Sequence, residues 1–312
     1  MDIGGTATRS LVADVDGRVL GTGRAGGGNP VACGAAGLAA IRAAMGDALA
    51  AVDPADVAAA VYGFAGGDVA VKDPAVVTAL AAGWRAAGLR CTPVMVADAT
   101  LAFVAGTPAA DGSVLIAGTG AVAADIRDRD VVRTEDGHGW LLGDDGSGFW
   151  LGREAVRATI RRADRRLAMT SLDRAVLADL EVSAVVAPEL TNAAVAAAHR
   201  LRPVDLARLA PLVLALAGAG EPDALEITTR AAVLLVDALR AVRPVGALGP
   251  VVLSGGLLTA SNPLALAVRS RCAEVWPGAE IHAAGPTAAA AAWLASRQLA
   301  EPPETLYRAL IG

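Results

Sequence analysis

The stretch DGHGWLLGDDGSGFWLGR, residues 136–153, decides how the rest of the chain is interpreted. It contains six glycines, three acidic residues and two tryptophans. Glycine lets the backbone approach a ligand or adopt positive φ, and Trp140 and Trp150 can form rigid walls. A connecting surface loop is the alternative, but such loops rarely hold two of a chain's five tryptophans beside the acidic pair Asp144–Asp145. The run predicts a shaped polar binding site that opens into a helix.

The length and composition favour a two-domain protein that binds a small ligand. A chain of 312 residues can bury two cores, and a cleft between domains is the usual ligand site. No apolar run has membrane-spanning length and no secretory signal precedes Asp2, so we expect a cytoplasmic protein without a membrane partner. The formal net charge is −5, with Lys72 as the single lysine, which argues against nucleic acid.

Strand and helix signals alternate along the chain, which predicts an α/β architecture with covered central sheets. Residues 1–28 are typical of short strands joined by tight turns. The pair Asp73–Pro74 has the form of a helix N-cap followed by proline in the first turn. We expect a buried strand over Val94–Ala97 with Asp98 directly after it, and mostly helix over 149–243.

The strand pattern restarts after a break near residue 108. Ile3–Thr6 matches Ile116–Thr119 at the start of the two halves, which indicates an internal duplication. We therefore expect two domains, 1–108 and 109–312, with the last helix packing back on the first domain.

Three glycine turns follow predicted strands: Gly4-Gly5-Thr6, Gly118-Thr119-Gly120 and Ser254-Gly255-Gly256. Such turns expose backbone N–H groups and a hydroxyl, which suit phosphate oxygens. Each turn alone is equally typical of a hairpin or a routine strand-to-helix turn, and none matches the lysine-bearing phosphate loop. The first two, in equivalent places of duplicated halves, are predicted to hold a polyphosphate, and a flat base could lie against the third.

Acidic residues stand where phosphate-bound Mg²⁺ and proton transfer need them. Asp2 precedes the first turn, and Asp144 or Asp145 lies in the central run; either place suits Mg²⁺. Asp98 is the candidate for chemistry because it ends a buried strand, at the sheet edge where ligands bind. Its alternative role is a helix N-cap, and one residue can do both.

His138 and Asn29 are further candidates for contact with a polar ligand. His138, between two glycines, can donate to a sugar or phosphate oxygen, and a hydrogen bond to backbone is the competing role. Asn29 offers one acceptor and two donors to a hydroxyl-rich ligand, although its Gly-Asn-Pro context is also typical of a turn.

Taken in order, these motifs resemble the N-acetylglucosamine kinase and BadF/BadG/BcrA/BcrD-type ATPase family, a branch of the actin, sugar-kinase and heat-shock-chaperone ATPase superfamily. The similarity covers nearly the whole chain, and the motif over residues 138–150 looks most like the actinobacterial glucosamine kinases. The resemblance implies an α/β fold of two ribonuclease-H-like, actin-like ATPase domains, each with a βββαβα core, around an interdomain cleft. Family members carry several apolar residues ahead of the position of Asp2, and this sequence departs from them there.

The resemblance also assigns roles to individual residues. The first two glycine turns would be the phosphate motifs, and Gly255 and Gly256 would form the adenosine motif. Asp98 would be the catalytic base, while Asp2 would reach Mg²⁺ through the phosphates. The sugar side would be lined by Asn29, Gly66, Gly67 and Asp144, with His138 beside them.

Our leading hypothesis is a kinase that uses ATP and Mg²⁺ to phosphorylate the 6-hydroxyl of glucosamine, with N-acetylglucosamine as the alternative substrate. Glucosamine is preferred because the acidic residues suit a cationic sugar. An ATPase that activates a radical dehydratase or reductase shares these motifs but needs cysteines for an iron–sulfur cluster, and Cys33, Cys91 and Cys272 lack short spacing. A sugar sensor without turnover has no need of Asp98. We expect a homodimer.

Overall fold

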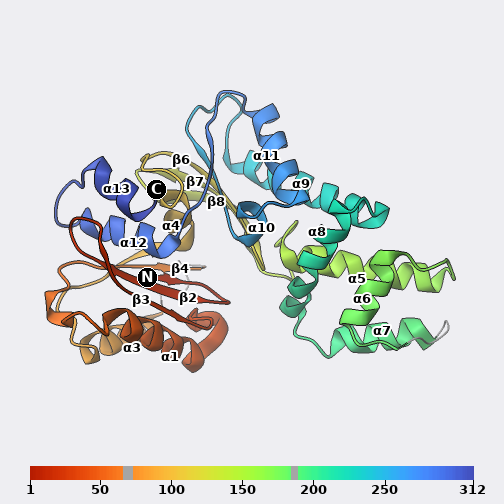
Figure 1. Ribbon diagram of the computed structural model, residues 1–312, viewed down its shortest axis with the longest axis horizontal. Helices are drawn as coiled ribbons and strands as arrows, with labels where there is room; N and C mark the ends of the chain where they lie inside the picture. Colours follow the sequence, from red (N-terminus) through yellow and green to blue (C-terminus); the bar gives the residue numbers. More distant parts are fainter. Residues whose placement is uncertain (66–72, 184–188) are drawn as a thin grey trace. The chain divides into compact units, whose positions relative to one another are not determined.

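The computed structural model describes residues 1–65, 73–183 and 189–312, so Gly66 and Gly67 lie outside the described residues. The chain divides into two compact units: unit 1 comprises 1–112, 126–132 and 284–312, and unit 2 comprises 113–125 and 133–283. Each unit contains a five-stranded sheet, which confirms the predicted α/β class (Figure 1). The units differ from the expected domains chiefly in residues 284–312, which belong to unit 1.

Unit 1 contains β1 (Asp2–Ile3), β2 (Thr8–Ala13), β3 (Val19–Ala25), α1 (Pro30–Leu49), η1 (Pro54–Asp56), β4 (Val61–Phe64), α3 (Pro74–Ala86), β5 (Val94–Ala97), α4 (Asp98–Val104), α12 (Thr287–Ser296) and α13 (Glu304–Leu310). The sheet order is β3-β2-β1-β4-β5, with β1, β4 and β5 parallel and β2 antiparallel to both of its neighbours. The N-cap predicted at Asp73 is confirmed, because its Oδ1 accepts a hydrogen bond from the Ala75 N–H at 2.8 Å.

The second sheet and its helices comprise β6 (Gly112–Ala117), β7 (Ala121–Arg127), β8 (Asp130–Asp136), α5 (Gly148–Asp164), α6 (Ser171–Asp179), α7 (Glu189–His199), η2 (Pro203–Leu209), α8 (Ala210–Gly218), α9 (Pro222–Val242), β9 (Val251–Ser254), α10 (Gly256–Thr259), α11 (Pro263–Val275) and β10 (Ile281–Ala283). They belong to unit 2 except for Gly112, the end of β7 and the start of β8, which fall in unit 1. This sheet has the order β10-β9-β6-β7-β8, with β6, β9 and β10 parallel. From β8 to β10 this order repeats that of the first sheet: β8, β7 and β6 correspond to β3, β2 and β1, and β9 and β10 correspond to β4 and β5. The repeated order confirms the duplication. The helical block predicted over 149–243 is confirmed by α5 to α9.

The sheet of unit 1 is covered on both faces along its central strands, so β1 and β4 are buried, whereas much of β3 is exposed. Ile3, Tyr62 and Phe64 are buried in one cluster with residues of α1 and α3. Val61 points to the other face, where it packs in a cluster with residues of α4 and α12. Figure 1 shows α1 and α3 on one side of this sheet and α12 on the other.

Trp150 corrects one expectation from the sequence. It is 3% exposed and lies in the main core of unit 2, so it does not form the wall of a polar cleft. The reason is that α5 begins two residues earlier, and its first turn directs this side chain into the core, with the guanidinium of Arg230 over the ring. Trp140 remains 39% exposed and packs edge-on against Phe149.

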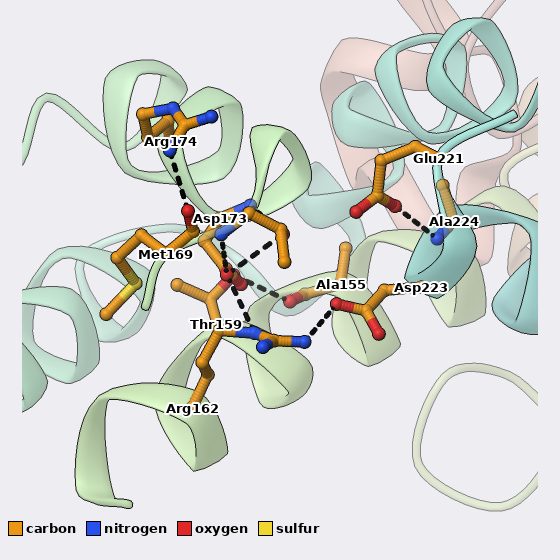
Figure 2. Close-up of polar contacts among 10 residues, drawn as sticks. Ala155, Thr159, Arg162, Met169, Asp173, Arg174, Glu221, Asp223 and Ala224 are labelled. Atoms are coloured by element: carbon orange, nitrogen blue, oxygen red, sulfur yellow. Dashed lines mark hydrogen bonds and ion pairs between the residues drawn. The ribbon is translucent and has the colours of Figure 1, made fainter. Parts of the chain in front are cut away.

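The helices of unit 2 are joined by a buried ion pair (Figure 2). Arg162 on α5 donates from Nε to Asp173 Oδ2 at 3.0 Å and from Nη2 to Asp223, the second residue of α9. Asp173 is fully buried and also accepts from Thr170 in the capping box of α6. One arginine therefore connects the starts of two helices to the last turn of α5.

Within the described residues, no single helix has the length and hydropathy needed to cross a membrane, although the bent pair Pro203–Gly218 and Pro222–Val242 passes the same test when taken together.

Candidate active site

The carboxyl ends of β1, β4 and β5 form one edge of the sheet in unit 1. In the strand registers Ile3 lies opposite Phe64, and Phe64 lies opposite Ala97. The residues that follow are Gly4, Ala65 and Asp98, so the first glycine turn, the end of β4 and the candidate base stand at the same edge. In parallel sheets this is the edge that binds ligands.

The loop with Asn29 is fixed to this edge by hydrogen bonds. The carbonyl oxygen of Gly4 accepts from the N–H groups of Gly28 at 3.0 Å and Asn29 at 3.3 Å. The Asn29 side chain donates from Nδ2 to the carbonyl of Ala65 at 2.8 Å. A Cβ built on Gly5 would meet no atom of the described residues within 4 Å, which leaves room for a ligand beside that part of the turn.

Asp98 is the first residue of α4, so it does not occupy the N-cap, which is one of the two roles that the sequence left open. The N-cap is Ala97, with extended φ −67 and ψ 148, and no side chain caps this helix. Burial raises the pKa of Asp98 to about 7, and the nearby Asp2 carboxylate contributes to the increase. A hydrogen bond from the Ala99 N–H acts in the opposite direction. A carboxylate that titrates near neutrality is suited to general base chemistry.

Asp2 is buried and held in place by two donors. Its Oδ2 accepts from the hydroxyl of Thr287 at 2.6 Å and from Arg9 Nη1 at 3.2 Å. The described residues include no group of three or more histidine, cysteine or acidic side chains that could enclose a metal. Mg²⁺ bound to nucleotide commonly takes only one or two protein carboxylates. Asp2, beside Asp98, is a carboxylate of the kind that such an ion takes.

The second and third glycine turns are neighbours in unit 2. Ile116 on β6 lies opposite Ser254 on β9, so the turns that follow these residues begin at the same edge of the sheet. Gly255 has φ 86, and a Cβ there would be 2.2 Å from the carbonyl oxygen of Ala117. Only glycine fits this close approach.

The start of α5 lies against the second turn. The carbonyls of Gly118 and Thr119 accept from the N–H groups of Gly148 at 2.8 Å and Phe149 at 3.1 Å. The positive end of the helix dipole is therefore directed at the turn. Among the residues that the structure describes, no atom would lie within 4 Å of a Cβ on Gly118, which leaves room for a phosphate beside the backbone. These features fit a nucleotide phosphate.

Asp144 lies against the same turn. Its Oδ1 accepts from the Ala121 N–H at 3.1 Å, and a Cβ on Gly120 would be 2.6 Å from that oxygen. Burial raises the pKa of Asp144, and the neighbouring carboxylates of Asp136 and Asp145 raise it further. The hydrogen bond from the Ala121 N–H and the nearby His138 lower it. Asp145 and His138 are exposed.

Asp136 is a residue that our sequence analysis gave no role. Its carboxylate accepts from the N–H of Asp144 at 2.6 Å and from the N–H of Asp145 at 2.8 Å. These bonds hold Asp144 at φ 59, a conformation that is unusual for a residue with a side chain. The signal in the sequence was an acid directly before a glycine, at the start of the stretch over residues 136–153.

Two duplicated α/β units with glycine turns at the carboxyl edges of parallel strands define an actin-like ATPase fold. The chain belongs to the BadF/BadG/BcrA/BcrD ATPase family, whose profile matches residues 1–294.

The comparisons with individual proteins cover different lengths of this chain. The chain is 29% identical over 93 residues to an N-acetylmuramic acid/N-acetylglucosamine kinase of Clostridium acetobutylicum, a match that spans 30% of each protein. A crystal structure of a provisionally designated N-acetylglucosamine kinase from Chromobacterium violaceum is 26% identical, with a TM-score of 0.69 over 94% of this chain and 96% of that one. A glucokinase from Streptomyces griseus, solved with glucose and AMPPNP, has the same fold at 21% identity, with a TM-score of 0.59 over 95% and 98%.

Proposed function

We propose that this protein is an ATP-dependent hexosamine kinase that phosphorylates the 6-hydroxyl of N-acetylglucosamine in preference to glucosamine. The observation that carries the proposal is the edge of unit 1, where Asp98 stands in line with an open glycine turn and beside the Asn29 loop. The preference for the acetylated sugar reverses our expectation from the acidic residues. It is supported by the two relatives that are designated N-acetylglucosamine kinases.

In this proposal the glycine turns bind the nucleotide through backbone, and side chains act on the sugar. The turn at Gly118 binds phosphate, with the positive end of α5 behind it. Asp98 accepts the proton of the attacking hydroxyl as its oxygen bonds to the γ-phosphorus and the bond to the β-phosphate oxygen breaks. Mg²⁺ near Asp2 would neutralise phosphate charge. Contact of Asn29, His138 and Asp144 with the sugar stays a prediction.

A coupled assay of ADP release tests the proposal with glucose, glucosamine, N-acetylglucosamine and N-acetylmannosamine as acceptors. We expect the highest kcat/KM with N-acetylglucosamine and the product phosphorylated at O6 by mass spectrometry and NMR. A higher value for glucosamine would reject the sugar choice but keep the kinase. ATP hydrolysis that is indifferent to every sugar, in a brown protein containing iron, would instead favour the activator of a radical enzyme.

A further inference from the structure

Two arginines lie opposite each other on the sheet of unit 1, close to the edge that carries the first glycine turn. In the strand registers Asp2 of β1 lies opposite Arg9 of β2, and Arg9 lies opposite Arg24 of β3. One row of residues separates them from the turn. Residues directly opposite on neighbouring strands share a face of the sheet and interact. Asp2, Arg9 and Arg24 therefore form one row of charged side chains near the ligand edge.

This row faces the α12 side of the sheet. Asp2 accepts a hydrogen bond from the first residue of α12. On β3 the Cβ position of Gly23 is directed at a backbone carbonyl of α1, so Arg24, the next residue, points to the opposite face. Figure 1 shows α1 and α12 on opposite sides of this sheet. Arg24 is exposed and the Arg9 side chain is 47% exposed, so a ligand can reach both guanidinium groups.

The row carries two positive charges and one negative charge. Arg9 donates from Nη1 to Asp2 Oδ2 at 3.2 Å, and among the described residues its Nε and Nη2 make no hydrogen bond. Within the same part of the chain, the side chain of Arg24 forms no hydrogen bond or ion pair. Like charges directly opposite on neighbouring strands destabilise a sheet. An anion held between the two guanidinium groups would remove this repulsion.

A phosphate is the anion that fits both the place and the donors. Phosphoryl transfer puts negative charge on the phosphate oxygens, and enzymes stabilise it with cations. The first glycine turn supplies backbone N–H groups but no charge, and Lys72, the single lysine, lies outside the described residues. A guanidinium binds phosphate through two parallel N–H groups. Nε and Nη2 of Arg9 form such a pair while Nη1 stays on Asp2.

We propose that Arg9 and Arg24 bind the terminal phosphate of ATP at the first glycine turn, and that Arg9 is a further catalytic residue. This inference rests on the proposed function, because it takes the turn as a nucleotide phosphate site. The sugar hydroxyl oxygen bonds to the γ-phosphorus, its proton passes to Asp98, and the bond to the β-phosphate oxygen breaks. Arg9 stabilises the negative charge of the transferred group during this step, and Arg24 adds a second charge that holds it.

Calorimetry with ATP and with AMP, each without sugar, tests the two arginines. Arg9→Met should weaken ATP binding by about tenfold or more, because a charge-assisted hydrogen bond is lost. Arg24→Met should weaken it severalfold. The affinity for AMP should stay unchanged in both variants, because AMP lacks the terminal phosphates. Arg85→Met is the matched control: Arg85 is exposed on α3, donates to its own helix, and should affect neither nucleotide.

Thermal melts without nucleotide separate binding from a structural role. Arg9→Met should melt earlier, because it leaves the Asp2 carboxylate without its charged partner. Arg24→Met should melt at the same temperature or higher, since it loses no contact among the described residues and removes a repulsion. Unchanged ATP affinity in folded Arg9→Met, or equal losses for ATP and AMP in both variants, would overturn the proposal. If Arg9→Met does not fold, unchanged ATP affinity in Arg24→Met would overturn it.

Sugar-dependent release of ADP distinguishes failure of this inference from failure of the proposed function. We expect Arg9→Met to lower kcat by about a hundredfold, the usual cost of removing one donor to the transition state. Arg9→Lys should recover part of this loss, because it restores the charge without the planar pair of donors. A parent protein that phosphorylates N-acetylglucosamine, with an Arg9→Met variant of equal kcat, would reject the catalytic role and keep the kinase. ATP affinity that depends on both arginines, in a parent protein that phosphorylates no sugar, would reject the kinase and keep the phosphate site.

Discussion

The hydroxyl of Thr287 donates a hydrogen bond of 2.6 Å to Asp2 Oδ2, which joins the first residue of α12 to β1 across 285 positions of the sequence. Asp2 in turn is the acidic neighbour that helps to raise the pKa of Asp98. The C-terminal segment thus positions a carboxylate beside the proposed base.

Thr287→Val removes this hydrogen bond at nearly constant size. Because the acceptor is a buried carboxylate, we expect the free energy of unfolding to fall by about 1.5–3 kcal/mol. Urea denaturation measures the change, and Thr287→Ser should restore most of it. Thr78→Val, at an exposed position of α3, is the matched control. Equal losses at the two positions would show that the contact with Asp2 adds nothing.

Asp98→Asn should lower kcat by roughly two to four orders of magnitude, the usual contribution of a positioned base. The affinity for ATP should persist, since the proposed phosphate contacts are made by backbone. Melting should not occur earlier, because Ala97 and not Asp98 occupies the N-cap. Steady-state kinetics, calorimetry and a thermal melt check the three statements. An unstable variant whose folded fraction is fully active would move the base to Asp144 or Asp145.

The pH dependence follows from the raised pKa of Asp98. The free enzyme holds a proton on this carboxyl below about pH 7, so kcat/KM should rise with pH through that value and then level off. The unfolded chain loses the same proton near its ordinary value of 3.8. The stability that Asp98 contributes is therefore full below about pH 4 and is lost as the pH rises through about 7. Asp98→Asn should melt higher than the parent protein at pH 8, with the difference shrinking towards pH 5.

Gly118→Val should abolish ATP binding, because the new side chain enters the open space beside the second turn. The fold should persist, since no atom in the described part of the chain lies within 4 Å of the Cβ position. Gly46→Val is the control: its Cβ also meets no atom within 4 Å, and it lies on α1 away from the turns. Unchanged nucleotide affinity by calorimetry in a folded Gly118→Val protein would reject the assignment of this turn.

Arg162→Met should destabilise unit 2 by about 3–5 kcal/mol, because it leaves the fully buried Asp173 without its charged partner. Arg161→Met changes an exposed arginine next to it on α5 and should cost little. Chemical denaturation of the two variants gives the comparison. The double variant Arg162→Met, Asp173→Leu should recover much of the loss, and no recovery would mean that the pair itself is not the cause.

The sequence by itself determined the local features of this protein. Glycine turns after short apolar strands, the Asp73 cap and the place of Asp98 at the end of β5 depend on residues that are neighbours in the chain. The duplication was visible for the same reason, because each half repeats the strand and turn signals in order. Periodicity and turn chemistry encode such features within a few residues.

Only the tertiary structure decided which of these features meet. The sheet order places Gly255 against Ala117 and the Asn29 loop against Ala65. The contact of Asp144 with Ala121 spans 23 positions, and that of Thr287 with Asp2 spans 285. No local pattern encodes these pairs, because each pair depends on which segments lie side by side in the folded sheet. The burial of Trp150 has the same cause: its face of α5 is set by the helices packed around it.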